Sequence, residues 1–116
     1  MVGKGQLEGE CKGMNNVETV CKYLPGVELL CQLAEEAAEL AQAALKMRRA
    51  LDGTNWTPKT LEECMAALEE EIADVEGVLE ALDYATPLVN YDKVHGIQSA
   101  KMHRWAKRLE EHHAND

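Results

Sequence analysis

The chain has 116 residues and a formal net charge of −9, and 46% of its residues are hydrophobic while only 4% are aromatic. This length fits one small domain with an aliphatic core, and the acidic balance argues against a nucleic-acid polymer as the main partner. No apolar run is long enough to span a membrane, and the first residues lack the hydrophobic segment of a signal peptide. We therefore expect a cytoplasmic protein without membrane contacts.

The expected elements are all helical. Residues 1–15 are rich in glycine and favour a flexible arm, followed by a single domain over residues 16–113 and a short tail at 114–116. The expected helices span residues 16–23, 27–51, 61–84 and 91–111. Gly53 is expected to end the second helix, and Thr60 with Glu63 forms a capping-box pattern at the start of the third. The sequence predicts an all-α, four-helix-bundle-like fold.

The cysteines and histidines do not follow a metal-binding pattern. The sequence has no Cys-x-x-Cys pair, so in a reducing compartment the cysteines are expected to be free thiols. Their spacing relative to the histidines matches no known zinc site. The residues concerned are Cys11, Cys21, Cys31, Cys64, His95, His103, His112 and His113.

Two acidic residues of the long central helices lie on or beside the apolar face of their helix. In the third helix Val75, Val78 and Leu82 lie within about 40° of Glu71 around the helix axis, so Glu71 occupies the middle of the apolar face. Glu36 lies at the edge of the apolar face of the second helix. A carboxylate on such a face is costly unless it is paired, protonated or bound to a metal ion.

Each of these two helices offers a pair of carboxylates spaced i, i+3, namely Glu36 with Glu39 and Glu71 with Asp74. If the helices pack antiparallel, the four side chains converge. Mg²⁺ suits a site made only of carboxylates, and Mn²⁺ is a possible substitute. The alternative is that these are solvated glutamates that form salt bridges with Lys46 or Lys101.

The ordered motifs Glu36-Ala37-Ala38-Glu39 and Glu71-Ile72-Ala73-Asp74 resemble the ExxE…ExxD pattern of MazG-like all-α nucleoside triphosphate pyrophosphohydrolases. The resemblance covers about residues 27–109. It implies that Glu36, Glu39, Glu71 and Asp74 bind Mg²⁺, which holds the triphosphate of an NTP or dNTP. It also implies cleavage between the α- and β-phosphates, giving a nucleoside monophosphate and pyrophosphate, and assembly as a homodimer or homotetramer.

Further residues are candidates for catalysis or substrate binding. Glu35 is a candidate general base, although a surface glutamate is the simpler interpretation. Lys101, Arg104 and Arg108 form a basic stripe on the last helix. They resemble phosphate-binding residues of the family, and the alternative is that they are exposed charges that offset the acidic excess. Trp56 either stacks on a base or anchors its loop. Relatives often carry a lysine where this chain has Gln32. The candidate substrate-binding residues are Gln32, Lys46, Trp56, Lys101, Arg104 and Arg108.

Three other functions are consistent with parts of the sequence. Phosphoribosyl-ATP pyrophosphohydrolase has a similar fold and motif, but no residue of this sequence indicates recognition of the sugar-phosphate group of its substrate. A di-iron bundle requires two Glu-x-x-His pairs on core faces, and only Glu110-x-x-His113 matches, at the end of the last helix. A non-catalytic helical interaction module, with solvated acidic faces and apolar stripes that bind partner helices, is the third.

Overall fold

The computed structural model describes residues 15–53, 58–85 and 88–114, and every regular element in these segments is a helix. The helices are α1 (Asn16–Tyr23), α2 (Gly26–Asp52), α3 (Leu61–Tyr84) and α4 (Tyr91–Ala114). The predicted all-α class is therefore confirmed. The predicted bounds of the first and third helices match, and those of the second differ by one residue at each end. The fourth helix is three residues longer than expected because its end contains no glycine or proline.

Helix boundaries follow local capping chemistry. Asn15 and Glu18 form a capping box at the start of α1, and Thr60 and Glu63 form the predicted one at the start of α3. Gly53 ends α2 with φ of +66°, a left-handed conformation that favours glycine. Residues 1–14 and the predicted loop residue Trp56 lie outside the described residues.

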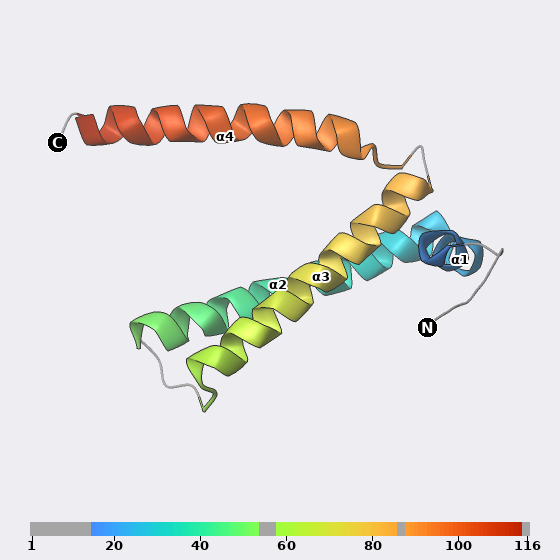
Figure 1. The fold of residues 1–116 in the computed structure, drawn as a ribbon, viewed down its shortest axis with the longest axis horizontal. Coiled ribbons are helices and arrows are strands. Elements are labelled where there is room, and N and C mark those ends of the chain that lie inside the picture. The colour runs from blue at the N-terminus through green and yellow to red at the C-terminus, as the bar shows by residue number, and fades with distance from the viewer. Residues whose placement is uncertain (1–14, 54–57, 86–87, 115–116) are drawn as a thin grey trace.

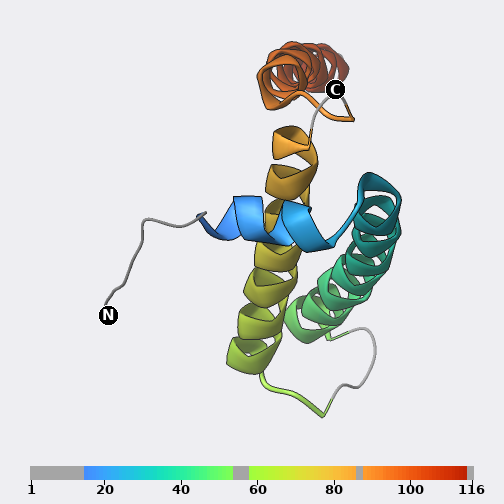
Figure 2. The same cartoon turned by 90° about the vertical axis from the view of Figure 1, so that its right-hand side faces the viewer.

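Helices α2 and α3 form an antiparallel pair, and α1 lies across α3 (Figures 1 and 2). Leu29, Ala81 and Leu82 form the buried centre where the three helices meet. The Cys21 thiol of α1 donates a 3.3 Å hydrogen bond to the carbonyl oxygen of Ala81. These contacts tie α1 to the C-terminal half of α3.

Helix α4 projects from this three-helix unit (Figure 1). Its start is fixed by Asp83, whose carboxylate accepts a 2.8 Å hydrogen bond from the Tyr91 backbone N–H. Beyond Tyr91 every described residue of α4 is exposed. The radius of gyration is 19.1 Å, compared with about 13 to 14 Å expected for a compact chain of this length. The chain on its own therefore does not close a four-helix bundle.

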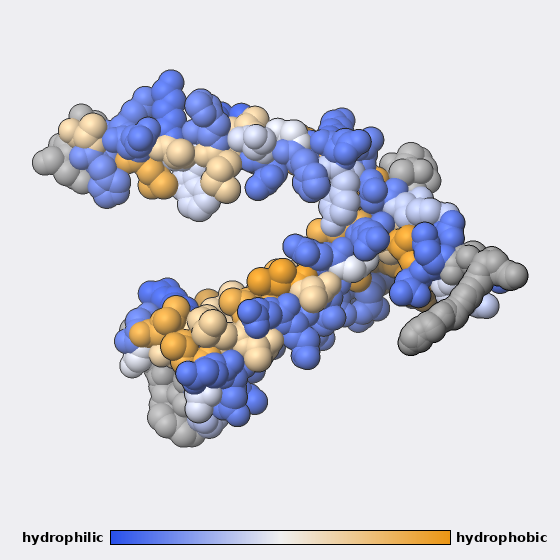
Figure 3. Space-filling model, viewed as in Figure 1, coloured by the Kyte–Doolittle hydropathy of each residue, from blue (hydrophilic) through white to orange (hydrophobic). Residues whose placement is uncertain are grey.

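Two groups of exposed apolar side chains stand out among those on the surface of the described residues. Figure 3 shows them along the side of α4 that faces the open space and at the far end of the α2–α3 pair. The exposed residues on α4 are Val94, Ile97, Met102, Trp105 and Leu109, and those near the facing ends of α2 and α3 are Leu45, Leu51, Leu61 and Met65. Such surfaces are typical of helices that pack against another chain.

Candidate metal centre

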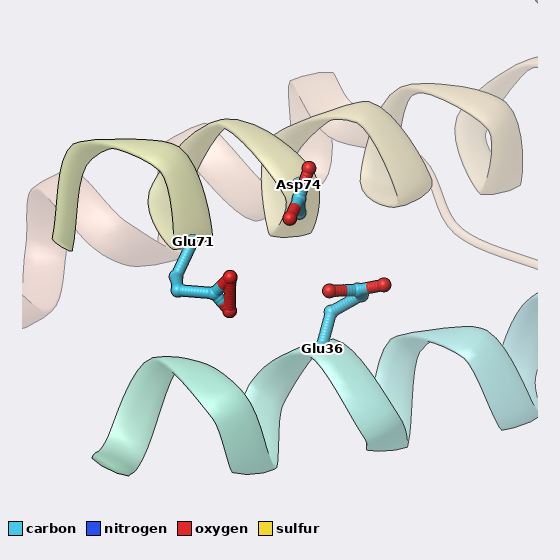
Figure 4. A group of neighbouring side chains, drawn as sticks. All are labelled: Glu36, Glu71 and Asp74. Atoms are coloured by element: carbon cyan, nitrogen blue, oxygen red, sulfur yellow. The ribbon is translucent and has the colours of Figure 1, made fainter. Parts of the chain in front are cut away.

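Three carboxylates meet on the seam between α2 and α3. Glu36 points from α2 toward Glu71 and Asp74 of α3 (Figure 4). One oxygen atom from each side chain lies within 4.8 Å of the others. Glu71 and Asp74 share a side of α3 because they are spaced i, i+3, and the antiparallel packing brings Glu36 opposite them. The predicted convergence of these three residues is observed.

The carboxylates of this cluster are short of hydrogen-bond donors. Glu36 Oε1 and Glu71 Oε2 are buried, and neither has a hydrogen-bond partner among the described residues. The other oxygen of Glu36 accepts a 2.6 Å hydrogen bond from Gln32 Nε2. Buried carboxylate oxygens without partners are costly, and a bound cation removes that cost.

The pKa of Glu71 is raised because its side chain is desolvated and lies beside other carboxyl groups. Desolvation raises the pKa of Glu71, and the nearby carboxyl groups of Glu39, Asp74 and Glu36 raise it further. The ionised form is thus disfavoured in the protein without a cation. This is the behaviour expected of like charges held together on a partly apolar face.

The donor set fits a hard divalent cation. All the ligand atoms are carboxylate oxygens, the type that Mg²⁺ and Mn²⁺ prefer. Oxygen atoms around one Mg²⁺ lie about 3 to 4.2 Å apart, given bonds of about 2.1 Å. Since the three oxygens lie within 4.8 Å of one another, small side-chain rotations suffice to close the site. Glu36, Glu71 and Asp74 are the residues that could hold the ion.

The other two acidic candidates lie at the margin. Glu39 is exposed and is outside the group of three, but it reaches Glu71 closely enough to raise the pKa of that residue. Glu35 is exposed on α2 and does not belong to the group. The sequence motif therefore brings three of its four acidic residues together, with the fourth beside them.

Two hollows flank the cluster along the seam. One of about 210 Å³ is lined by Glu39, Gln42, Ala43, Lys46, Lys59, Cys64, Ala67, Glu70 and Glu71. The other, of about 320 Å³, is lined by Val20, Leu24, Leu29, Gln32, Glu36, Ala73, Asp74, Gly77, Val78 and Ala81. Lys46 and Gln32, both predicted to bind substrate, thus line opposite hollows. Lys59 was not predicted, because it belongs to no motif and no helical periodicity applies to it.

The predicted basic residues of α4 share a separate surface. Lys101, Arg104 and Arg108 line an open hollow of about 620 Å³ together with Trp105 and four other residues of the same helix. This surface lies on α4 alone and not on the α2–α3 seam. The predicted basic stripe exists, but within one chain it is not part of the carboxylate cluster.

Alternative metal sites find no support in the described residues. Among them, Glu36, Glu71 and Asp74 are the one group of three or more metal-binding side chains that lie close together. Cys21, Cys31 and Cys64 are free thiols, as expected, and Cys11 lies outside the described residues. None of the described helices combines the length and the apolar character needed to cross a membrane.

Comparisons with protein-family models, with curated proteins and with solved structures found no match for this chain. The site must therefore be interpreted from its own geometry and chemistry.

Proposed function

We propose that this protein is a Mg²⁺-dependent nucleotide pyrophosphohydrolase of the MazG-like type. The observation that supports the proposal is the meeting of Glu36, Glu71 and Asp74 on the α2–α3 seam, where one oxygen each of Glu36 and Glu71 is buried without a donor among the described residues. Glutamates that are simply solvated on the surface would keep both carboxylate oxygens in contact with water. The ordered ExxE and ExxD motifs on two antiparallel helices match the resemblance in residue type, order and spacing.

The role of the ion would be to bind and orient phosphate oxygens, neutralise charge that develops on them, and lower the pKa of a water molecule. The acidic residues of the seam would form the binding site for this ion. Glu36, Glu71 and Asp74 would hold the ion, and Glu39, which lies beside Glu71, would serve as a further ligand. Gln32 fixes one oxygen of Glu36 by its 2.6 Å hydrogen bond and so sets the direction of the other oxygen.

The substrate in this proposal is an NTP or dNTP, cleaved between the α- and β-phosphates to give the monophosphate and pyrophosphate. Glu35 is exposed on α2 next to Glu36 in the chain, and we retain it as the candidate base for the attacking water. No described residue selects the additional sugar-phosphate of phosphoribosyl-ATP, so the nucleoside triphosphate is the substrate class that we propose. We place the reaction in the cytoplasm, where the free thiols persist.

The proposed active form is a homodimer or homotetramer in which a second copy completes the four-helix bundle. Helix α4 carries five lysines and arginines and three acidic residues, a net charge of +2, so the remainder of the chain carries −11. Its exposed apolar residues alternate with Lys101, Arg104 and Arg108. A face of this kind suits an acidic, partly apolar partner surface such as the α2–α3 seam. Sedimentation at micromolar concentration tests the assembly: a monomer throughout would contradict it.

The exposed face of α4 also favours a second candidate function, a non-catalytic helical interaction module. In that case the acidic seam has no chemical role, and Glu71→Gln leaves all measurable functions unchanged. The two proposals therefore differ in what they expect of one residue.

The decisive experiment incubates the protein with a panel of NTPs and dNTPs in the presence of Mg²⁺ and separates the products by chromatography. We expect a nucleoside monophosphate and pyrophosphate. Formation of diphosphate and phosphate, or no turnover of any nucleotide, would refute the proposed function. Glu69→Gln serves as the matched control for Glu71→Gln, because Glu69 is an exposed residue of the same helix.

A further inference from the structure

The seam between α2 and α3 has a polarity along its length. At one end a hollow contains the cations Lys46 and Lys59, in the middle lie the clustered carboxylates, and at the other end a hollow is lined mainly by aliphatic side chains. The two hollows share no lining residue. Each adjoins the cluster, the first through Glu71 and the second through Glu36 and Asp74.

Lysines from different helices converge on the first hollow. Lys46 belongs to α2, and Lys59 precedes the Thr60 cap of α3. Neither has a carboxylate within salt-bridge distance among the described residues, although the charge of Lys59 contributes to lowering the pKa of Glu63. Three carboxylates, Glu39, Glu70 and Glu71, line the same hollow. Glu71 belongs to the carboxylate cluster, and Glu39 is the further ligand of the proposed function. With an ion bound by both, Lys46 and Lys59 would face Glu70 as the one remaining carboxylate of this hollow.

The second hollow differs in chemistry. Val20 and Leu24 of α1, Leu29 of α2 and Val78 of α3 give it an aliphatic lining. The side-chain amide of Gln32 is already engaged with Glu36. Within the described residues this hollow contains no cation, so it suits an uncharged group and not an anionic one.

We infer that Lys46 and Lys59 form an anion subsite that holds the pyrophosphate end of the substrate, while the nucleoside end lies in the aliphatic hollow. This inference rests on the proposed function, because it orients that substrate across the carboxylate cluster. Cleavage between the α- and β-phosphates then leaves the pyrophosphate on the lysine side and the monophosphate on the aliphatic side. Lys59 is thereby assigned a substrate-binding role that its sequence position alone did not indicate.

The test measures binding without turnover, so it does not depend on finding the substrate. Isothermal titration calorimetry in excess Mg²⁺ gives the affinity for inorganic pyrophosphate of the wild-type protein and of Lys46→Gln/Lys59→Gln. Loss of two charge-assisted contacts is expected to weaken pyrophosphate binding about tenfold or more. The matched control is Lys93→Gln/Lys107→Gln, which removes the same charge from exposed positions of α4. It is expected to leave pyrophosphate affinity within about twofold of wild type, because the charges that it removes lie outside the seam.

The nucleoside monophosphate that binds the wild-type protein most tightly, among those matching the NTP and dNTP panel, reports the direction. Its affinity is expected to be unchanged by the lysine variant, and the Mg²⁺-induced rise in Tm is expected to persist. Equal loss of pyrophosphate binding in both double variants would overturn the inference, since bulk charge would then explain it. Equal weakening of monophosphate and pyrophosphate would overturn the orientation. Pyrophosphate binding lost only in the seam variant, without nucleotide turnover in wild type, would support the anion subsite and refute the hydrolase.

Discussion

The α2–α3 seam and helix α4 both carry charged side chains on an apolar helix face, but only the seam is covered by neighbouring helices. Both place charged side chains within an apolar helix face: carboxylates on the seam, and Lys101, Arg104 and Arg108 on α4. On the seam the apolar residues are covered by neighbouring helices and the charges are partly buried with them. On α4 the whole face is exposed. A charged residue on an apolar face thus has different consequences depending on whether a partner helix covers it.

The largest effect is expected from the packed core of the seam. Leu82 is fully buried, so Leu82→Ala is expected to lower the free energy of unfolding by about 2 to 5 kcal/mol. On α4, Leu109 is 46% exposed, and Leu109→Ala is expected to change it by less than about 0.5 kcal/mol in the monomer. Urea denaturation at low protein concentration measures both. Similar losses in the two variants would show that α4 is packed in solution.

The second effect concerns the charged part of the seam. Glu71→Gln is expected to reduce nucleotide hydrolysis by more than about 100-fold, the upper limit for residues that merely support metal ligands. It is also expected to raise the Tm of the metal-free protein, because it removes a desolvated charge from beside Glu39, Asp74 and Glu36. Millimolar Mg²⁺ is expected to raise the Tm of the wild type but not of this variant. An equal response to Mg²⁺ in both proteins would place the ion elsewhere.

A smaller effect is expected at the residue that orients Glu36. Gln32→Ala removes the 2.6 Å hydrogen bond to Glu36 Oε2 and is expected to weaken Mg²⁺ binding about tenfold. Calorimetric titration with Mg²⁺ measures the change. Gln98→Ala, at an exposed glutamine of α4, is the matched control. If both glutamine variants bind Mg²⁺ like the wild type, Gln32 does not position the ligand.

The smallest effect is expected at the cap of α3, where Thr60→Ala is expected to lower the free energy of unfolding by about 1 kcal/mol.

A hydrogen bond from the Thr60 backbone N–H is the main cause of the lowered pKa of Glu63, partly opposed by desolvation. The stabilising contribution of Glu63 is therefore present above the ordinary carboxyl pKa and is lost as the pH falls through the lowered value. Thermal unfolding of wild type and Glu63→Gln between pH 7 and pH 3 checks this. Parallel curves for the two proteins would contradict the assignment.

The sequence predicted the helices well because their boundaries depend on local chemistry. The Thr60–Glu63 cap and the Gly53 terminus need only neighbouring residues. The convergence of Glu36 with Glu71 and Asp74 was also predictable, since helical periodicity places each residue and a hairpin brings the faces together. The position of α4 was not predictable from its apolar stripe. Periodicity identifies a face that requires a partner, but it does not tell whether the partner lies in the same chain.

Lys59 illustrates a second limit. It lies outside any helix and belongs to no motif, so its place in a hollow with Lys46 depends on how the chain returns from α2 to α3. Such a residue becomes visible only when both helix ends are fixed in space. The apolar hollow is similar, because Val20 and Leu24 reach it from α1.

The packing of α1 has a consequence for the order in which the protein folds. Helices α2 and α3 are neighbours in the chain, so their contacts close a short loop, whereas the Tyr84 hydroxyl that donates to Glu18 joins residues 66 positions apart. Contacts between distant residues form later because closing the larger loop costs more chain entropy. The carboxylate cluster is therefore expected to assemble before the aliphatic hollow beside it. Amide hydrogen exchange is expected to be faster in α1 than at the centre of α3, because α1 packs less extensively on α3 than α2 does.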